Sequence, residues 1–395
     1  MLNIAVIGGG VGGLSAAIAL RDKGHRVDVY EQTAELRAVG AGFGVLPNAM
    51  HLLATVGLDK DVQRIGFSAD DSIARDAQGN RLGVENWPQK RSSLGRTFAV
   101  HRGEFQQVLV SKLPPEVVHL GKKAVEVRQH HGGGASVDFA DGTTITADLV
   151  IGADGIRTVV QASLGLEVRA TGEGVMAYRT LVPVEKLSWA QQDKRLAIWF
   201  GEGRTFLCYL VSAGRIMNVV GYVPSDRDAA ESWSAEGDLG QLREAFAGWE
   251  PRVQETIEAA GSTFKWGVFD RPPLTRWSTE SVTLLGDAAH AMVPHLGQGA
   301  NQAIEDAFAL ATILDGAGQE SLAGLLKVYE SVRIDRTSLV QNVSREAGRL
   351  YRDFSNDDMT KKAEAISDLI SRNHIAGYDA IAEAERALSR HRATT

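Results

Sequence analysis

The start of the chain alternates between strand and helix patterns. Residues Asn3 to Ile7 form a short apolar run, Val11 to Lys23 carry Ala and Leu at helical spacing, and Arg26 to Tyr30 alternate apolar and polar side chains. A strand, a helix and a second strand in this order are typical of a βαβ unit. The pattern therefore predicts an α/β fold that opens with a Rossmann-like domain.

Strand patterns dominate the middle of the chain. Two strand-like segments follow Ala124, with turns at His130 to Gly134 and at Asp141-Gly142, and Asp148 to Ile151 returns to a buried strand. The stretch Phe67 to Gly95 is irregular and polar. Four further strand-like runs, with turn residues between them, are Val175 to Pro183, Arg195 to Phe200, Thr205 to Val211 and Arg215 to Val223. These runs predict a mainly antiparallel sheet, inserted as a second domain.

The remaining patterns are helical, apart from the buried strand Ser281 to Leu285. Helices are expected over Pro47 to Gly57, Gly103 to Leu113, Leu239 to Trp249, Val253 to Ala260, Gln298 to Leu314, Ser321 to Tyr351 and Met359 to Arg392. At roughly 150 residues per domain, a chain of 395 residues is expected to form two or three domains, or one large fold with an insertion.

Composition and charge narrow the class of partner. Hydrophobic residues make up 44% of the chain, and 42 basic against 49 acidic residues leave a net charge of -7. Nucleic-acid and anionic-membrane surfaces need clustered Lys and Arg, so neither is expected as a partner. Chemistry on small molecules becomes the leading expectation.

Cysteine use and the N-terminus indicate a reducing, cytoplasmic setting. Cys208 is the single cysteine and lies inside the apolar run Phe206 to Val211, which predicts a buried thiol, no disulfide and no thiolate metal site. The apolar stretch Met1 to Leu20 contains bunched glycines and no preceding basic residue, so it is expected to be neither a signal peptide nor a membrane span. No metal site is expected.

A glycine motif between the first strand and the first helix predicts a dinucleotide site. Gly8, Gly10 and Gly13 fit G-x-G-x-x-G, and Glu31 ends the next strand. The glycines let backbone N–H groups approach a pyrophosphate at the positive end of the helix, and Glu31 can accept hydrogen bonds from a ribose diol. The motif favours FAD or NAD over NADP but leaves the choice between FAD and NAD open.

A second string of residues favours a flavin. In LLGDAAHAMVPHLGQGANQAIEDAFAL, a buried strand ends at Gly286-Asp287, and a glycine loop then leads into a helix that carries Glu305 and Asp306. Asp287 is placed to accept hydrogen bonds from a polyol such as a ribityl chain. The loop Gly297 to Gly299 offers N–H groups and a helix dipole to the anionic edge of a reduced flavin.

Over essentially its full length the chain resembles the single-component FAD-dependent aromatic-ring hydroxylases, which include salicylate, 3-hydroxybenzoate and 6-hydroxynicotinate monooxygenases. Three motifs carry the resemblance: Gly8 to Gly13 with Glu31, Asp148 to Gly155 (DLVIGADG), and Gly286 to Asp306. The resemblance implies that the first motif holds the AMP half of FAD and that the second contributes to both FAD and NAD(P)H binding. It implies that the third motif holds the ribityl chain and the ring edge. The FAD contacts that it implies beyond the first motif are Arg102, Asp154, Gly155, Asp287, Gly299 and Asn301.

The resemblance also implies how the chain is divided. A FAD-binding domain covers residues 1–170 and 273–350, a substrate domain covers 171–272, and a helical segment covers 351–395. The C-terminal helices pack either on their own domain or on a second copy in a homodimer. The middle motif departs from the family, because Thr158 and Gln161 stand where Ser and Arg are usual, and Arg157 is a candidate to replace the missing guanidinium.

The chemistry that the resemblance implies consumes NAD(P)H and O2. Reduced FAD takes up O2 as a C4a-hydroperoxide, which hydroxylates a small phenolic or hydroxypyridine-type ring. The protein has to exclude water, hold the ring and favour the phenolate. A base that works near neutral pH, most simply His or a relayed Tyr, is therefore expected in the pocket.

His295 and Tyr209 are the candidates for catalysis. His295 lies in the loop before the flavin-facing helix, and serves either as base or substrate ligand or as a loop histidine bonded to backbone. Tyr209, like Tyr178, lies on the inserted sheet and either faces the pocket or packs in the core. His290 is expected to be structural or a cofactor contact. Arg179 is a candidate to bind a substrate carboxylate, although it and Tyr178 face opposite sides of one strand.

Two pairs of neighbouring residues, one aromatic and one of histidines, are also considered as pocket residues. Only one of Trp199 and Phe200 can point into the pocket, because neighbours on a strand face opposite sides. His130 and His131 lie in a glycine-rich turn and are expected to be solvated.

Three other functions stay open at this point. An NAD-linked dehydrogenase would use the first βαβ unit but leaves the Gly286 to Asp306 string unexplained. A flavin-binding redox protein without turnover is a second alternative. A flavin monooxygenase or epoxidase that acts on a larger polycyclic or non-aromatic compound is the third, and it needs a markedly larger cavity.

Overall fold

A five-stranded parallel sheet forms the centre of the N-terminal domain. The computed structural model describes residues 1–36, 41–69, 71–85, 94–166, 168–226, 235–352 and 359–394. The strands of this sheet are β1 (Asn3–Ile7), β2 (Arg26–Tyr30), β8 (Val118–His119), β12 (Leu149–Gly152) and β19 (Val282–Leu284), in the order β19-β12-β1-β2-β8. Because parallel strands are covered on both faces, β1 and β12 are almost continuously apolar and buried. The predicted βαβ opening and α/β fold are confirmed.

Two small antiparallel sheets flank the parallel one. The predicted hairpins form β9 (Ala124–Gln129), β10 (Ala135–Phe139) and β11 (Thr144–Ala147). The other small sheet, in the order β3-β7-β4, contains β3 (Gly42–Val45), β4 (Phe67–Ser68) and β7 (Phe98–His101). The histidines His130 and His131 are exposed in the first hairpin turn, as expected.

The inserted sheet has eight strands, in the order β17-β18-β13-β16-β15-β14-β5-β6. Its strands are β5 (Ser72–Asp76), β6 (Arg81–Glu85), β13 (Thr171–Pro183), β14 (Leu196–Gly201), β15 (Arg204–Val211), β16 (Ile216–Pro224), β17 (Ala235–Gly237) and β18 (Thr263–Asp270). All pairs are antiparallel except β14 with β5. The four predicted strands are thus confirmed, and four more join them.

The prediction that Phe67 to Gly95 is irregular was wrong where the structure describes it. Strands β5 and β6 arise there and extend the sheet beyond residues 171–272. Polar residues hid β5, because Arg75 is buried and only partly paired inside the fold: its Nη1 donates to Gly79 O at 2.8 Å, its Nη2 lies 3.8 Å from Asp193, and its Nε has no hydrogen-bond partner among the described residues. Residues 86–93 lie outside the described part of the chain.

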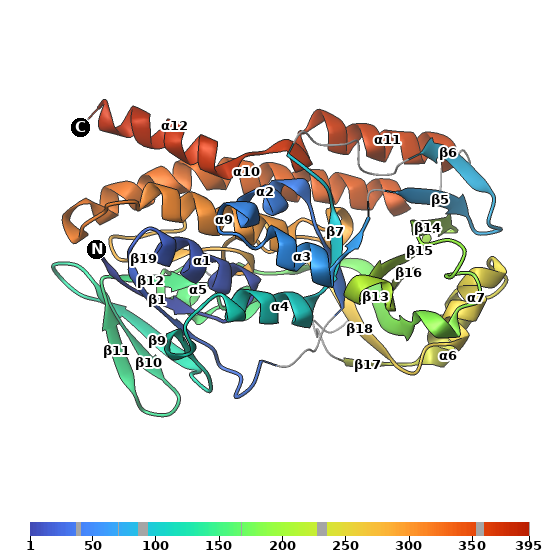
Figure 1. The fold of residues 1–395 in the computed structure, drawn as a ribbon, viewed down its shortest axis with the longest axis horizontal. Helices are drawn as coiled ribbons and strands as arrows, with labels where there is room; N and C mark the ends of the chain where they lie inside the picture. The colour runs from blue at the N-terminus through green and yellow to red at the C-terminus, as the bar shows by residue number, and fades with distance from the viewer. Residues whose placement is uncertain are drawn as a thin grey trace.

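Helices surround the sheets. They are α1 (Val11–Asp22), α2 (Pro47–Thr55), α3 (Asp59–Ile65), α4 (Arg102–Ser111), α5 (Val159–Ser163), α6 (Leu239–Ala245), α7 (Pro251–Glu258), α8 (Asp287–His290), α9 (Gly299–Ile313), α10 (Gln319–Arg352), α11 (Met359–Arg372) and α12 (Ala380–Arg392). Figure 1 shows α11 and α12 lying along the long helix α10, so the C-terminal helices pack on their own chain.

One predicted helix is broken in two. The stretch Met359 to Arg392 was expected to be continuous, but α11 ends before His374, whose backbone is left-handed at φ 49° and ψ 39°. Asp379 then caps α12, because its Oδ1 accepts from the N–H groups of Ile381 and Ala382 at 3.1 Å each. A left-handed residue and a new N-cap cannot lie inside one regular helix.

The inserted sheet is covered on both faces. Trp199 packs in the core under α6 and α7, whereas Phe200 faces the other side and stacks on Tyr351 with ring centroids 5.8 Å apart. Tyr178 lies in the Trp199 core and donates to Gln241 Oε1 at 3.1 Å, so it does not face the pocket. Cys208 is buried in the same core, as expected, and burial raises the pKa of its thiol.

A buried ionic network joins α9 to α10. Arg333 donates from Nε to Asp306 Oδ1 and from Nη1 to Glu305 Oε2, at 2.7 Å each, and all three side chains are fully buried. The other oxygen of Asp306 accepts from Gly286 N at 2.8 Å and lies 2.6 Å from His290 Nε2. The network therefore fixes the turn between β19 and α8.

Nearby positive charges keep the two carboxylates of the network ionised. Burial opposes ionisation of Asp306, but His290 and Arg333 outweigh it and lower the pKa of Asp306 to about 2. Arg336 adds a second cation at 3.1 Å from Glu305 Oε1, and the two arginines lower the pKa of Glu305 against the effect of burial. Removal of one partner would leave a buried charge without compensation.

Replacing Arg333 by Met should destabilise the protein by about 3–5 kcal/mol, because two carboxylates then lose their shared cation in the core. Denaturant unfolding of the holoenzyme measures this loss. Arg386→Met, which breaks an exposed pair with Glu383 on α12, is the matched control and should change little. Equal stability of the two variants would contradict a structural role for the network.

Asp306 should also make stability depend on acid pH. Because its folded-state pKa of about 2 is below the ordinary 3.8, the ionised group stabilises the fold above pH 3.8, and this stabilisation is lost as the pH falls toward 2. The difference in unfolding free energy between the native protein and Asp306→Asn should therefore shrink by about 2 kcal/mol over that range. A difference that stays constant down to pH 2 would exclude this assignment.

Candidate functional site

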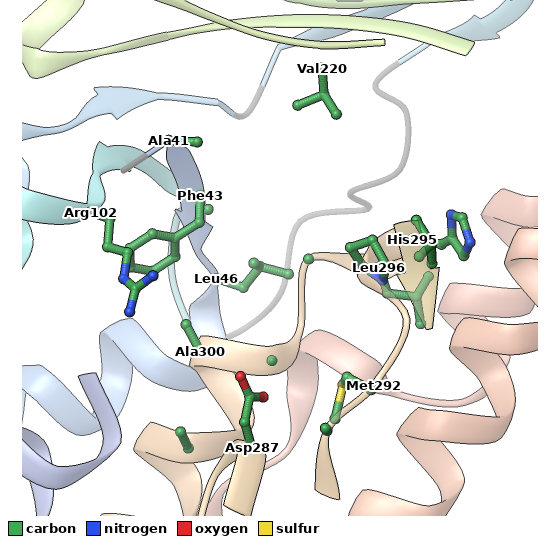
Figure 2. A pocket seen from close by; sticks show the side chains of 18 of the residues that line it. Ala41, Phe43, Leu46, Arg102, Val220, Asp287, Met292, His295, Leu296 and Ala300 are labelled. Carbon is green, nitrogen blue, oxygen red and sulfur yellow. The ribbon is translucent and has the colours of Figure 1, made fainter. Parts of the chain in front are cut away.

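One large cavity lies between the parallel sheet and the inserted sheet. Its volume is ≈1090 Å³, and its wall includes Gly10, Asp154, Asp287 and Gly299 from the N-terminal domain and Val220 from the inserted sheet. Figure 2 shows Asp287 and Ala300 on one side of this space and Val220 on the opposite side. The glycine motif and the distant 286–306 string therefore border the same site.

The glycine loop packs tightly on one side and is open on the other. Gly8 has a φ of 113°, and a Cβ there would lie 2.3 Å from Ala153 O, while a Cβ on Gly13 would lie 2.0 Å from Gly8 O. A Cβ on Gly10 would meet nothing within 4 Å. Helix α1 begins after Gly10 without a side-chain cap and without an acidic residue in its first turn. Its N–H groups are thus available to a pyrophosphate.

Glu31 lies beside this loop, but its side chain is not part of the cavity wall. Its Oε2 accepts from Gly9 N at 2.7 Å, and its Oε1 accepts from Thr33 N at 2.8 Å. The carboxylate therefore holds the glycine loop to the end of β2. Its contact with a ribose diol stays a prediction.

The middle motif places a carboxyl group at the cavity. Asp154 and Gly155 both line it, and Asp154 Oδ2 accepts from Val159 N at 2.7 Å. The other oxygen, Oδ1, is buried without a hydrogen-bond partner among the described residues, and burial raises the pKa of Asp154. An acceptor of this kind suits a hydroxyl or N–H donor of a bound molecule.

The departures from the family have structural roles. Thr158 caps α5, because its Oγ1 accepts from Gln161 N at 2.9 Å. Gln161 in turn donates from Nε2 to Ala288 O at 3.0 Å, which ties the middle motif to the residue after Asp287. Arg157 lines the cavity, so a guanidinium is present near the usual arginine position.

The third motif contains the start of α9, which is a second helix without a side-chain cap. Asp287 begins α8, and its Oδ1 lies 3.8 Å from the point that a Cβ on Gly299 would occupy. Helix α9 starts at Gly299 with no side-chain cap and no acidic residue in its first turn. Its N–H groups and positive dipole face the same cavity as those of α1.

Asn301 links the third motif to the β3 segment. Its Nδ2 donates to Gly44 O and Gly297 O at 2.9 Å each, and its Oδ1 accepts from Leu46 N at 2.8 Å. The side chain is fully buried and outside the cavity wall. Because backbone groups occupy its amide, Asn301 holds the β3 segment against the glycine loop. Its contact with the flavin stays a prediction.

Arg102 and Tyr209 both line the cavity, Arg102 from the N-terminal domain and Tyr209 from the inserted sheet. Arg102 is the first residue of α4, and Phe43 lines the cavity as well. Tyr209 comes from β15, and its hydroxyl donates to Gly42 O at 2.7 Å. Burial raises the pKa of Tyr209 to about 12, so it is neutral at ordinary pH.

His295 lines the cavity, but its ring turns toward α10. A Cβ on Gly348 would lie 2.6 Å from His295 Nε2, and this nitrogen is buried without a hydrogen-bond partner among the described residues. Figure 2 shows the ring directed away from Val220. Burial, and to a smaller extent Arg352, lower the pKa of His295 to about 3. His290 is structural, since it is buried against Asp306 and Trp277.

Several cavity residues were not found from the sequence. They are Tyr222 on β16, Trp266 on β18, and Ile370, Ser371 and His374 from the α11 region. Period-two alternation on β16 could have suggested Tyr222, since it shares a face with Val220. The α11 residues carry no local signal, because only tertiary packing brings that helix to the cavity.

The described residues lack two further kinds of feature. Among them, no cluster of three or more His, Cys, Asp or Glu side chains is arranged to hold a metal ion. Within the same ranges, no helix has the length and apolarity needed to cross a membrane.

The residues present fit a flavin dinucleotide. Two helix N-termini, the unpartnered oxygen of Asp154 and the carboxylate of Asp287 face one elongated cavity. Its volume is at the top of the roughly 300–1,000 Å³ range of ligand pockets, as expected for a dinucleotide together with a small substrate.

Comparisons with known proteins agree with this site. Residues 1–344 match the FAD binding domain family. The chain is 35% identical over 371 residues to 3-amino-4-hydroxybenzoate 2-monooxygenase of Streptomyces cremeus, covering 90% of this chain and 89% of that protein. It is 34% identical over 352 residues to 6-hydroxynicotinate 3-monooxygenase of Bordetella bronchiseptica, covering 87% and 91%.

A solved structure shares the whole architecture. The substrate complex of salicylate hydroxylase matches with a TM-score of 0.83 and 30% identity over 98% of each chain. The matches in sequence and in structure extend across both domains and the cavity between them. The chain therefore belongs to the FAD binding domain family and, within it, to the single-component FAD-dependent aromatic monooxygenases.

Proposed function

We propose that this enzyme uses NAD(P)H and O2 to hydroxylate a small phenolic or hydroxypyridine-type ring. One oxygen atom of O2 enters the ring, and the other leaves as water. NAD(P)H supplies two electrons as hydride and is oxidised to NAD(P)+, and one proton from solvent completes the water. Bound FAD supplies the electron transfer and the oxygen activation. The observation that carries the proposal is the single cavity that joins two uncapped helix N-termini to an apolar sheet face.

The N-terminal domain holds the cofactor. The N–H groups at the start of α1 bind its pyrophosphate, and the Asp287 carboxylate accepts hydrogen bonds from the ribityl hydroxyls. The N–H groups at the start of α9 would donate hydrogen bonds to the edge of the flavin ring and would favour negative charge there. Arg102 contributes a further cation beside the dinucleotide.

The inserted sheet holds the substrate. Its cavity face carries Leu196, Leu207 and Val220, which pack on a flat ring and exclude water. The cavity, at ≈1090 Å³, has room for the dinucleotide and a substrate together.

Tyr209 and His295 act as neutral groups in this proposal. Tyr209 fixes β15 to the Gly42 backbone and lines the substrate side of the cavity. His295 fills the wall between Tyr222 and Tyr351, with ring centroids 5.7 and 5.6 Å away. A histidine with a pKa of about 3 is a weak base, so we assign its contribution to the shape of the cavity wall.

A substrate screen tests the function. Hydroxylated benzoates and pyridines are added to the FAD-loaded enzyme with NADH or NADPH, and NAD(P)H consumption is measured together with the hydroxylated product. Stimulated consumption with stoichiometric product supports the proposal. Peroxide release alone, with every phenol and hydroxypyridine, would contradict it, and turnover only of polycyclic compounds would assign the larger-substrate alternative.

Asp287→Ala should raise the dissociation constant of FAD about 10- to 100-fold, because a charge-assisted hydrogen bond to the ribityl chain is lost. Flavin absorbance per protein after gel filtration and titration of the apoprotein with FAD measure the loss. Asp315→Ala removes an aspartate that pairs with Lys23 away from the cavity and serves as control. Unchanged FAD affinity in Asp287→Ala would refute the ribityl contact.

His295→Gln should slow turnover more than it weakens FAD binding, and it should leave the ionisations in the pH profile of kcat/KM in place. The physical reason is that a group with a pKa near 3 does not titrate between pH 6 and 9. Gly348→Ala, whose Cβ would push the His295 ring, should slow turnover similarly. Disappearance of the acidic limb in His295→Gln would instead identify His295 as the base.

A further inference from the structure

Arg179 is a cation on the substrate side of the cavity. It lies on β13 opposite Val220 of β16, and both residues line the cavity. Its neighbour Tyr178 points into the opposite core, which fixes the direction of Arg179 toward the cavity. The remaining side chains of this sheet face are mainly apolar or hydroxyl-bearing.

The guanidinium is held in place from one side only. It lies over the Trp266 ring, with Cζ 4.7 Å from the ring centroid. A guanidinium held over an aromatic ring can still donate hydrogen bonds through its N–H groups. The side chain is therefore positioned before any ligand binds.

Arg179 keeps hydrogen-bonding capacity within the described part of the chain. Its Nε is buried there without a hydrogen-bond partner, and among the described residues Arg179 forms no ion pair. Arg352, another arginine of the cavity wall, is by contrast paired with Glu173 at 2.6 Å. A half-buried cation without a counter-ion is costly unless a ligand supplies the negative charge.

The charges of the wall favour an anionic ligand. Arginines on the wall outnumber carboxylates by five to two; the residues are Arg102, Arg157, Arg179, Arg271 and Arg352, with Asp154 and Asp287. The two aspartates belong to the cofactor side, whereas Arg179 lies on the sheet beside Tyr209 and Tyr222. The positive charge near the substrate is thus not cancelled locally.

We propose that Arg179, supported by Trp266, binds a carboxylate on the aromatic ring, so that the enzyme acts on aromatic acids. This inference rests on the proposed function. A carboxylate fits better than a phenolate, because it is ionised at neutral pH without assistance, and its two oxygens match the paired N–H groups of a guanidinium.

Matched acids and amides test the proposal. Salicylate is compared with salicylamide, and 6-hydroxynicotinate with 6-hydroxynicotinamide, by titration of the oxidised holoenzyme and the change in its flavin spectrum. The native enzyme should bind each acid about 10- to 100-fold more tightly than its amide. Arg179→Met should remove this preference by weakening the acids alone, and Arg179→Lys should keep part of it.

Lys265→Met is the control variant. Lys265 pairs in register with Tyr178, so it lies on the opposite face of the same sheet and contributes the same charge away from the cavity. It should leave the preference for acids unchanged. FAD content and melting temperature, measured for every variant, separate loss of binding from loss of folding.

The outcomes distinguish this proposal from the proposed function. Equal binding of acids and amides by the native enzyme, or a preference that survives in Arg179→Met, would overturn the carboxylate assignment while phenol turnover stands. An increase in the KM of NAD(P)H alone in Arg179→Met would assign the residue to the nicotinamide nucleotide instead and also overturn it. Failure of every phenol and hydroxypyridine to be hydroxylated would remove the proposed function, and this inference with it.

Discussion

The site depends on a buried pair of carboxylates held by Arg333. Glu305 and Asp306 lie in the middle of α9, where two adjacent charges would be unfavourable without a cation that reaches both. Asp306 also accepts from Gly286 N, so the same charge that joins two helices fixes the backbone before Asp287. The position of the polyol contact is therefore set by electrostatics in the core.

Two hydrophobic cores meet at the cavity without merging. One lies around the parallel sheet and α9, and the other lies between the inserted sheet and α6 and α7. Smaller contacts connect them: an apolar cluster of Ala69 and Ala99 with Tyr209 and Val211, and hydrogen bonds from Tyr209 to Gly42 and from Gly42 to Asn218, each at 2.7 Å. Because these contacts are small and separate, the two large cores leave the cavity between the domains.

The part of the site that could be predicted is built from residues that are close together in the sequence. The glycine motif and Asp287 follow strand ends, and such positions can be inferred from a few neighbouring residues. The role of Asn301 was missed because its partners Gly44 and Leu46 are distant in the sequence. Arg333 was missed for the same reason, since a cation in an amphipathic helix gives no sign that it is buried.

The sequence predicts that neighbouring residues on a strand face opposite sides of the sheet, but it does not predict which of them faces the core. Tyr178 and Arg179 had to face opposite sides, yet only packing against α6 and α7 decides which one faces the core. Strand β5 was hidden because one charge partner of buried Arg75, Asp193, lies far along the chain. In each case the missing information is a tertiary partner, and not a preference of the local sequence.

The parallel pairing of β14 with β5 has a consequence for how the molecule assembles. A strand from the first quarter of the chain completes a sheet whose other members are made much later, so this edge cannot form until a long loop has closed. The inserted sheet is consequently not an autonomous unit that can be cut out at its sequence boundaries. During synthesis on the ribosome, β5 and β6 have to wait for their neighbour, and both halves of the enzyme mature together.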